Sequence, residues 1–236
     1  MLQVRLMLLF AVAGLLGTNA SASEPVVARV GERGISVAAI KCDGALPAEY
    51  CNAAMQANLN TRIADAIVAA ATQRAGVRLT SEETAAFKKN HVPSDASISS
   101  LERGWKAAIE GAKLVQGGLT ADEAYERAVK PAGMSQAVFS DFLGKVQTDG
   151  ALQAFAVGAT SAALRAQLEH DAEMQLKLER IDASLRSSCG GDAAACERAR
   201  AAFWEDVLRS HPIRILDARF HAELPTFIPG ERHDTQ

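Results

Sequence analysis

The segment LNTRIADAIVAAATQRAGVRLTSEE, residues Leu59–Glu83, decides the fold of this chain. Its apolar side chains recur at the helical period and form a stripe that is wider than the narrow seam of a coiled coil. The stripe consists of Leu59, Ile63, Ala66, Ile67 and Ala70, widened by Ala64, Val68, Ala71 and Ala75. A helix that is apolar over so wide an arc lies in a core, so the rest of the chain must supply the elements that cover it.

The sequence also predicts where this helix ends. Gly76 can adopt the left-handed conformation that closes a helix, and Val77–Leu79 then reads as extended. Thr80 and Glu83 have the spacing of a capping box, which predicts a second helix over Glu82–Lys89. Since aromatic residues make up only 5% of the chain, we expect a mostly α-helical fold with small-residue contacts.

The N-terminus has the pattern of a secretory signal peptide, residues 1–22. Arg5 precedes the apolar run Leu6–Leu16, and Ala20-Ser21-Ala22 has the small residues of a cleavage site. The run is too short to span a bilayer, which needs about 20 residues. We therefore expect cleavage near Ala22, a soluble periplasmic protein, one helical domain over residues 23–224, and a disordered tail over 225–236.

The charge of the chain argues against some partners. Twenty-five basic and 28 acidic residues give a formal net charge of −3. Such mild acidity provides no electrostatic attraction for nucleic acid or for an anionic membrane. We expect neither as a partner.

Four cysteines lie in the part predicted to be exported: Cys42, Cys51, Cys189 and Cys196. Disulfides persist in an oxidising compartment, and of the three possible connectivities the two local pairs, 42–51 and 189–196, are the simplest. The alternative is a four-cysteine zinc site, but neither pair has the spacing usual for zinc ligands.

Helix starts and stops divide the remainder of the chain. Asn90–Ile98 reads as a polar connection, and Gly150 as a place where a long helix bends or breaks. Capping signals at Ser99 with Glu102, at Thr120 with Glu123 and at Ser135 predict helices that run to about Gln116, to the residues before Pro131, and over Gln136–Val157. Two further helices, Ser161–Ser187 and Ala193–Ser210, would form a hairpin across the second cysteine pair.

Two short strand candidates lie at opposite ends of this helical chain. Val26–Val30 is followed by a glycine-bounded turn, and Ser36 can cap a short helix that reaches Lys41. Ile213–Asp217 alternates like a strand. Each strand alone would leave backbone groups unpaired, so we predict that the two pair in a small β-sheet.

Several segments, in this order along the chain, resemble the SurA-type periplasmic chaperones. The shared features are a valine-rich strand and turn, a core helix ending at a glycine before a capped helix, a glycine and serine before an amphipathic helix, and a closing helix and strand. They are VVARVGERGIS (26–36), AGVRLTSEE (75–83), AGMSQAVF (132–139), and FWEDVL with IRILD (203–208 and 213–217).

The chain also departs from that family. Members commonly carry a parvulin prolyl-isomerase module, recognised by a Gly-Gly-Asp-Leu-Gly segment and by histidines in a small sheet. Here Gly190-Gly191-Asp192 is followed by alanines and lies between two cysteines. The resemblance thus implies a chaperone domain without the isomerase module, and without enzyme activity or cofactor.

Motifs for catalysis are weak in this sequence. Ser135 follows a glycine but lacks the second glycine of a nucleophile elbow, and a helix cap explains it better. His170, Asp171 and Glu173 could in principle bind a metal, but a solvated charged helix face is the simpler interpretation. We expect no catalytic or metal site.

The function we expect is that of a holdase, which shelters unfolded or partly folded exported proteins in an apolar cradle. Candidate cradle residues are Phe139, Phe142, Leu143, Val146 and Phe155. The alternative for these side chains is that they fill the core of the domain itself. The alternatives for the function are a dedicated assembly subunit with one partner and a prolyl isomerase.

Overall fold

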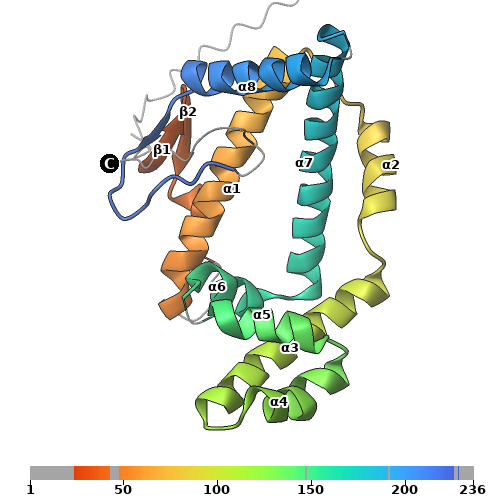
Figure 1. Ribbon diagram of the computed structural model, residues 1–236. Coiled ribbons are helices and arrows are strands. Elements are labelled where there is room, and N and C mark those ends of the chain that lie inside the picture. The colour runs from red at the N-terminus through yellow and green to blue at the C-terminus, as the bar shows by residue number, and fades with distance from the viewer. Residues whose placement is uncertain (1–23, 43–47, 147, 191, 226–227, 229–236) are drawn as a thin grey trace, which may run out of the picture.

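The computed structural model describes residues 24–42, 48–146, 148–190, 192–225 and 228. The predicted signal peptide and nearly all of the predicted tail lie outside these residues. Within the described residues the fold is mostly helical with one small antiparallel sheet, as expected. The long helices α1 (Ala48–Arg74) and α7 (Ser161–Ser188) stand side by side, and α8 (Ala193–Ser210) crosses their ends (Figure 1).

Helix α1 contains the segment that the sequence analysis placed in the core, and that prediction is confirmed. Leu59, Ile63 and Ile67 are completely buried. Gly76 has a φ of +66°, and Thr80 forms the predicted capping box with Glu83 at the start of α2 (Ser81–His91). The helix begins earlier than the apolar stripe, at Ala48, because its first turns pack against α6 rather than against the sheet.

The sheet consists of β1 (Val26–Val30), β2 (Arg33–Ser36) and β3 (Ile213–Ile215) in the order β2-β1-β3. Both pairings are antiparallel, and Ala28 lies opposite Ile215. The predicted pairing of the N-terminal and C-terminal strands is therefore confirmed. After β2 the chain forms a 3-10 turn (Ala38–Ile40), in which Ser36 accepts a hydrogen bond from the Ala39 amide.

The first core lies where the sheet, α1, α7 and α8 meet. Ile40, Ile181 and Trp204 are among its fully buried members and come from three distant parts of the sequence. Phe220 and Ile228, which follow β3, join the same cluster. The segment after the last strand thus continues to cover α1, and residue 228 belongs to the core although the sequence predicted a frayed tail from residue 225.

Both local cysteine pairs are disulfides. Cys42 is joined to Cys51 in α1, with 5.3 Å between the Cα atoms. Cys189 is joined to Cys196 in α8, with 5.2 Å between the Cα atoms, and closes the hairpin between α7 and α8. Disulfides of this kind are typical of proteins in an oxidising compartment such as the periplasm or the extracellular space.

A second core lies at the other end of α1 and α7, in the lower part of Figure 1. Its elements are α3 (Asp95–Gln116), α4 (Ala121–Ala124), a π-helix (Tyr125–Val129), a 3-10 turn (Lys130–Ala132), α5 (Gln136–Val146) and α6 (Gly150–Gly158). The predicted capping box at Thr120 and the predicted break near Gly150 are both confirmed.

The predicted start of α3 was wrong. Ser94, not Ser99, is the N-cap, and its hydroxyl accepts a hydrogen bond from the Ser97 amide. Glu102, which the sequence suggested as the partner of Ser99, instead accepts a hydrogen bond from the Ser161 amide at the start of α7. A contact between residues 59 positions apart therefore replaced the local capping box.

Gly31 closes the sheet against α8. It turns the β1–β2 hairpin with a φ of +57°, and its amide donates a hydrogen bond of 3.0 Å to the Pro212 carbonyl. A Cβ atom at this position would lie 3.1 Å from Cδ2 of His211. Both the backbone conformation and the space around it therefore favour glycine.

We expect Gly31→Ala to lower the free energy of unfolding by about 1–3 kcal/mol, because alanine at positive φ is strained and its methyl group crowds His211. Chemical denaturation measures the change. Gly144→Ala is the control, because Gly144 lies in α5 with nothing within 4 Å of an added Cβ. That variant should gain about 0.5–1 kcal/mol from helix propensity. Equal stabilities of the two variants would contradict the observed closure.

Candidate functional site

An apolar groove of about 640 Å³ lies between α3 and the segment that leads into α5. It is the most apolar of the large cavities in the described part of the chain. Its lining contains ten residues, none of which is ionisable: Pro93, Ser97, Ser100, Leu101, Gly104, Trp105, Gly133, Met134, Ser135 and Val138. A groove without charge in a chain with 22% charged residues is a candidate for binding apolar groups.

The groove is shaped by two glycines. Gly104 is buried in α3, and a Cβ there would lie 3.5 Å from the terminal methyl of Met134. Gly133 has a φ of +84° and turns the chain between the 3-10 turn and α5. This turn brings Met134 to the wall of the groove, and Ser135 then caps α5 as the sequence predicted, by accepting a hydrogen bond from the Val138 amide.

Trp105 connects the groove to an exposed apolar side chain outside it, that of Phe155. Its ring contacts the ring of Phe142 edge to face, with 5.8 Å between centroids, and that of Phe155 at 5.5 Å. Phe142 is buried, whereas 41% of Phe155 is exposed. The apolar surface therefore extends from Leu101 and Val138 in the groove, across Trp105, to Phe155 on α6.

The structure corrects the predicted cradle. Phe139, Phe142 and Val146 are buried in the second core, and Leu143 is half-buried against the same cluster. They contribute to the core of the domain, which was the alternative for these side chains, and the three buried ones are not accessible to a client. Phe155 alone of the five candidates is exposed.

The reason for this burial is the close approach of α3. A Cβ at Gly111 of α3 would lie only 2.7 Å from the Phe139 ring and 2.9 Å from Val129, so the ring packs directly on the helix backbone. Two residues outside the predicted cradle, exposed Leu101 and half-buried Trp105, lie four positions apart on one face of α3. That spacing, next to Ser97 and Ser100, was a signal that could have been read from the sequence.

Glu102 lies beside Leu101 in the sequence but serves another contact. Its carboxylate accepts hydrogen bonds from Lys106 and from both the amide and the hydroxyl of Ser161. These bonds, led by the one from Lys106, lower the pKa of Glu102 to about 2. The carboxylate therefore fixes α3 to the N-terminus of α7 and adds no charge to the groove lining.

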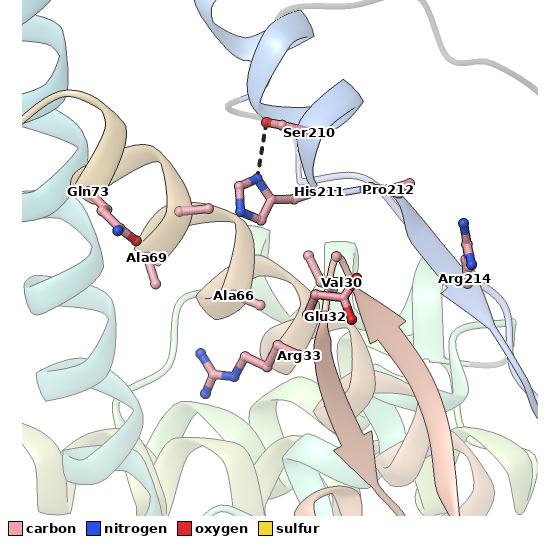
Figure 2. Close-up of a pocket in the computed structure, with 12 residues that line it drawn as sticks. Val30, Glu32, Arg33, Ala66, Ala69, Gln73, Ser210, His211, Pro212 and Arg214 are labelled. Carbon is pink, nitrogen blue, oxygen red and sulfur yellow. Dashed lines mark hydrogen bonds between the residues drawn. The ribbon is translucent and has the colours of Figure 1, made fainter.

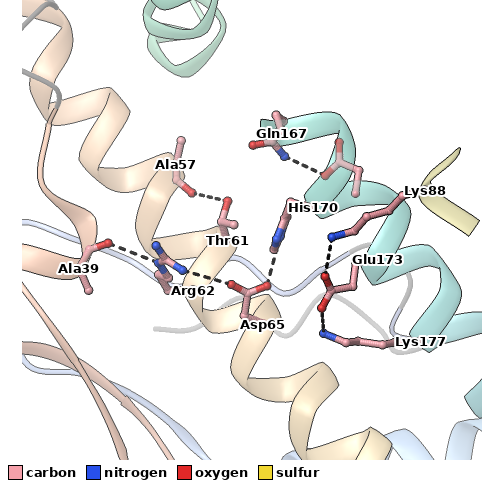
Figure 3. A network of polar contacts seen from close by, with 11 residues as sticks. Ala39, Ala57, Thr61, Arg62, Asp65, Lys88, Gln167, His170, Glu173 and Lys177 are labelled. Carbon is pink, nitrogen blue, oxygen red and sulfur yellow. Dashed lines mark hydrogen bonds and ion pairs between the residues drawn. The ribbon is translucent and has the colours of Figure 1, made fainter. Parts of the chain in front are cut away.

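A network of polar contacts joins α1, α2 and α7 (Figure 3). Asp65 of α1 lies 3.2 Å from Nε2 of His170 in α7. Glu173, one turn further along α7, accepts a hydrogen bond of 2.9 Å from Lys88 of α2 and another of 2.9 Å from Lys177. The two lysines, Lys177 foremost, lower the pKa of Glu173 to about 2.

The same contacts show how His170, Asp171 and Glu173, the residues considered as metal ligands, are engaged. Each of the three has a partner of its own, which for Asp171 is the Gln167 amide, and the three are not directed at one point. In the described residues there is no group of three or more histidine, cysteine or acidic side chains that could hold a metal ion. Asp192 of the Gly-Gly-Asp triplet caps α8 through the Ala194 amide.

Comparison with known proteins identifies no relative. No protein-family model, no curated protein and no solved structure matches this chain. Within the residues that the structure describes, none of the helices combines the length and the apolar character needed to cross a membrane.

Because of the lysine contacts of Glu173, we expect the stability of the fold to depend on pH in the acid range. Because folding lowers the pKa of this carboxyl from about 4.5 to about 2, the contact contributes its full stabilisation above pH 4.5 and loses it as the pH falls toward 2. Glu173→Gln should therefore be less stable than the natural protein at pH 7, and the difference should shrink between pH 4.5 and 2. Thermal unfolding over this pH range measures it.

Lys88→Met provides the matched variant, because it removes one of the two lysines and leaves the carboxylate in place. It should reduce the pH dependence without abolishing it. A stability difference between Glu173→Gln and the natural protein that is constant from pH 7 to pH 2 would contradict the assignment.

Proposed function

We propose that this protein is a periplasmic holdase-type chaperone that binds apolar segments of unfolded or partly folded exported proteins. The observation that carries the proposal is the groove between α3 and α5, whose lining is free of ionisable side chains and includes exposed Leu101 and Val138. The proposal keeps the function that the sequence indicated but moves the client site from the buried face of α5 to this groove.

The chemistry of the lining suits a client without a fixed sequence. Leu101, Met134 and Val138 offer apolar contact without direction, and the flexible thioether of Met134 can adapt to side chains of different shape. Trp105 adds a large ring that can stack on an aromatic client residue. Three serine hydroxyls, at positions 97, 100 and 135, can bond to the backbone of an extended client.

The absence of charge in the lining decides which segments can bind. A charged client side chain would lose water in this groove without gaining a partner, and that desolvation is costly. An apolar side chain gains about 25 cal/mol for each Å² that leaves water. The groove should therefore select uncharged, apolar segments, which are the segments that become exposed when an exported protein is unfolded.

The disulfides and the pairing of the terminal strands are also compatible with this proposal. The two disulfides suit an oxidising compartment, and a shelter of this kind requires no reactive group or cofactor. The pairing of terminal strands over a core helix is the chain topology that the resemblance to the SurA-type chaperones implies. We accordingly assign the protein a binding role and no catalysed reaction.

Leu101→Lys tests the groove against a matched control, Leu224→Lys. Both leucines are 43% exposed, but Leu101 lines the groove whereas Leu224 lies in the segment after β3. At equimolar ratio the natural protein should slow the aggregation of an unfolded outer-membrane protein, measured by light scattering. Leu101→Lys should lose most of this effect because it places a charge in the lining, and Leu224→Lys should retain it.

Three results would count against the proposal: no protection by the natural protein, equal loss in both variants, or full protection by Leu101→Lys. A pull-down from periplasm that recovers a single protein in fixed ratio, combined with absent protection, would favour the dedicated assembly subunit instead. Circular dichroism of each variant establishes that the fold is retained.

A further inference from the structure

A second cavity, of about 550 Å³, lies at the opposite end of the molecule from the groove. It is formed between the tip of the β1–β2 hairpin, one face of α1, and the junction of α8 with β3 (Figure 2). Its lining consists of Val30, Gly31, Glu32, Arg33, Ala66, Ala69, Ala70, Gln73, Ser210, His211, Pro212 and Arg214. We refer to it as the hairpin pocket.

The hairpin pocket has a small apolar base and polar walls. Ala66, Ala69 and Ala70 form one face of α1 and leave room that larger side chains would fill. Arg33 and Gln73 come from the hairpin and from α1 and extend beside these alanines (Figure 2). A ligand with a small apolar body and a polar end matches this division.

The wall formed by His211 is held in place. Its backbone amide donates to the Val207 carbonyl, and its Nδ1 lies 3.3 Å from the same carbonyl and 3.2 Å from the Ser210 hydroxyl. The ring therefore keeps one orientation, with the other nitrogen on the side of Ala66 (Figure 2). Gly31, on the other side of the pocket mouth from α1, is fixed by the hydrogen bond from its amide to the Pro212 carbonyl.

The charges of the hairpin pocket favour an anion. Arg33 and Arg214 both line it, and among the described residues neither has a carboxylate within ion-pair distance, whereas Arg74 at the end of α1 pairs with Asp206. β-pairing also places Arg29 directly opposite Arg214, and like charges so placed repel each other. Glu32 lines the pocket as well, so the lining has a formal excess of one positive charge.

We propose that the hairpin pocket binds a carboxylate carried on a small apolar group, of the kind present in the C-terminal residue of a polypeptide and in a free N-acylated amino acid. The Arg33 guanidinium pairs with the carboxylate, which arginine can bind through two parallel hydrogen bonds. The Gln73 amide donates a further bond, and the small side chain lies on Ala66 and Ala69. The site is separate from the groove and does not depend on the chaperone function.

Calorimetric titration of the intact protein tests the site with three probes: N-acetyl-Ala-Ala-Val with a free carboxylate, the same peptide as its C-terminal amide, and N-acetylvaline. We expect the free-acid peptide to bind and its amide to bind at least about tenfold more weakly, because a charge-assisted pair with Arg33 is lost. Equal affinity for peptide and N-acetylvaline would identify the carboxylate residue as the whole ligand. Stronger binding of the peptide would identify a chain terminus.

Arg33→Gln should weaken binding of the free acid by at least about tenfold. Arg103→Gln, which removes the same charge from an exposed position on α3, should change it less than about twofold. Ala69→Leu, which fills the pocket but leaves Arg33 in place, should also abolish binding. Thermal unfolding establishes that each variant is folded.

The proposal is overturned if neither free acid binds at millimolar concentration, if acid and amide bind equally, or if Arg33→Gln and Arg103→Gln weaken binding to the same extent. Unchanged affinity in Ala69→Leu would likewise overturn it. The aggregation assay of the groove variants is independent of all these results, so failure of one proposal leaves the other distinguishable.

Discussion

The hydrogen-bonded pairing of β1 with β3 is the constraint on which the rest of the structure depends. It joins segments near the two ends of the described chain and lays them over α1, whose wide apolar face would otherwise meet water. Gly31 contributes to the same closure at the hairpin, because its positive φ and the nearby His211 ring both disfavour a larger side chain. A helix as apolar as α1 is stable only when such elements cover it.

The helices that cover the first core also hold the second core in place. α1 extends beyond the first core, and its early turns meet α6 so closely that a Cβ at Gly150 would lie 3.1 Å from that of Ala53. α7 is fixed to α3 by Glu102 and to α2 by Glu173. The groove and the hairpin pocket thus occupy opposite ends of one frame, and the chemistry of their linings differs: one is uncharged and the other has excess positive charge.

Local signals predicted much of this fold. The core helix, the capping boxes at Thr80 and Thr120, the break near Gly150 and the strand pairing all follow from patterns within a few residues or from the need to satisfy backbone groups. The errors came from long-range contacts. Ser161 takes Glu102 away from Ser99, and the backbone of α3 at Gly111 admits the Phe139 ring, which turned an apparent binding face into a core. Neither of these two contacts can be predicted from residues that are neighbours in the sequence.

The most direct test of this account is a distance between the two ends of the chain. The amides of Gly31 and Leu216 donate to the carbonyls of Pro212 and Val27, and hydrogen-bonded and non-hydrogen-bonded pairs alternate between these positions. Ala28 and Ile215 therefore form a non-hydrogen-bonded pair, with Cα atoms about 4.5 Å apart. We expect a strong nuclear Overhauser effect between the α-protons of these two residues in the intact protein. Its absence, with the amide of Leu216 exchanging as fast as an unprotected one, would contradict the closure of the chain over α1.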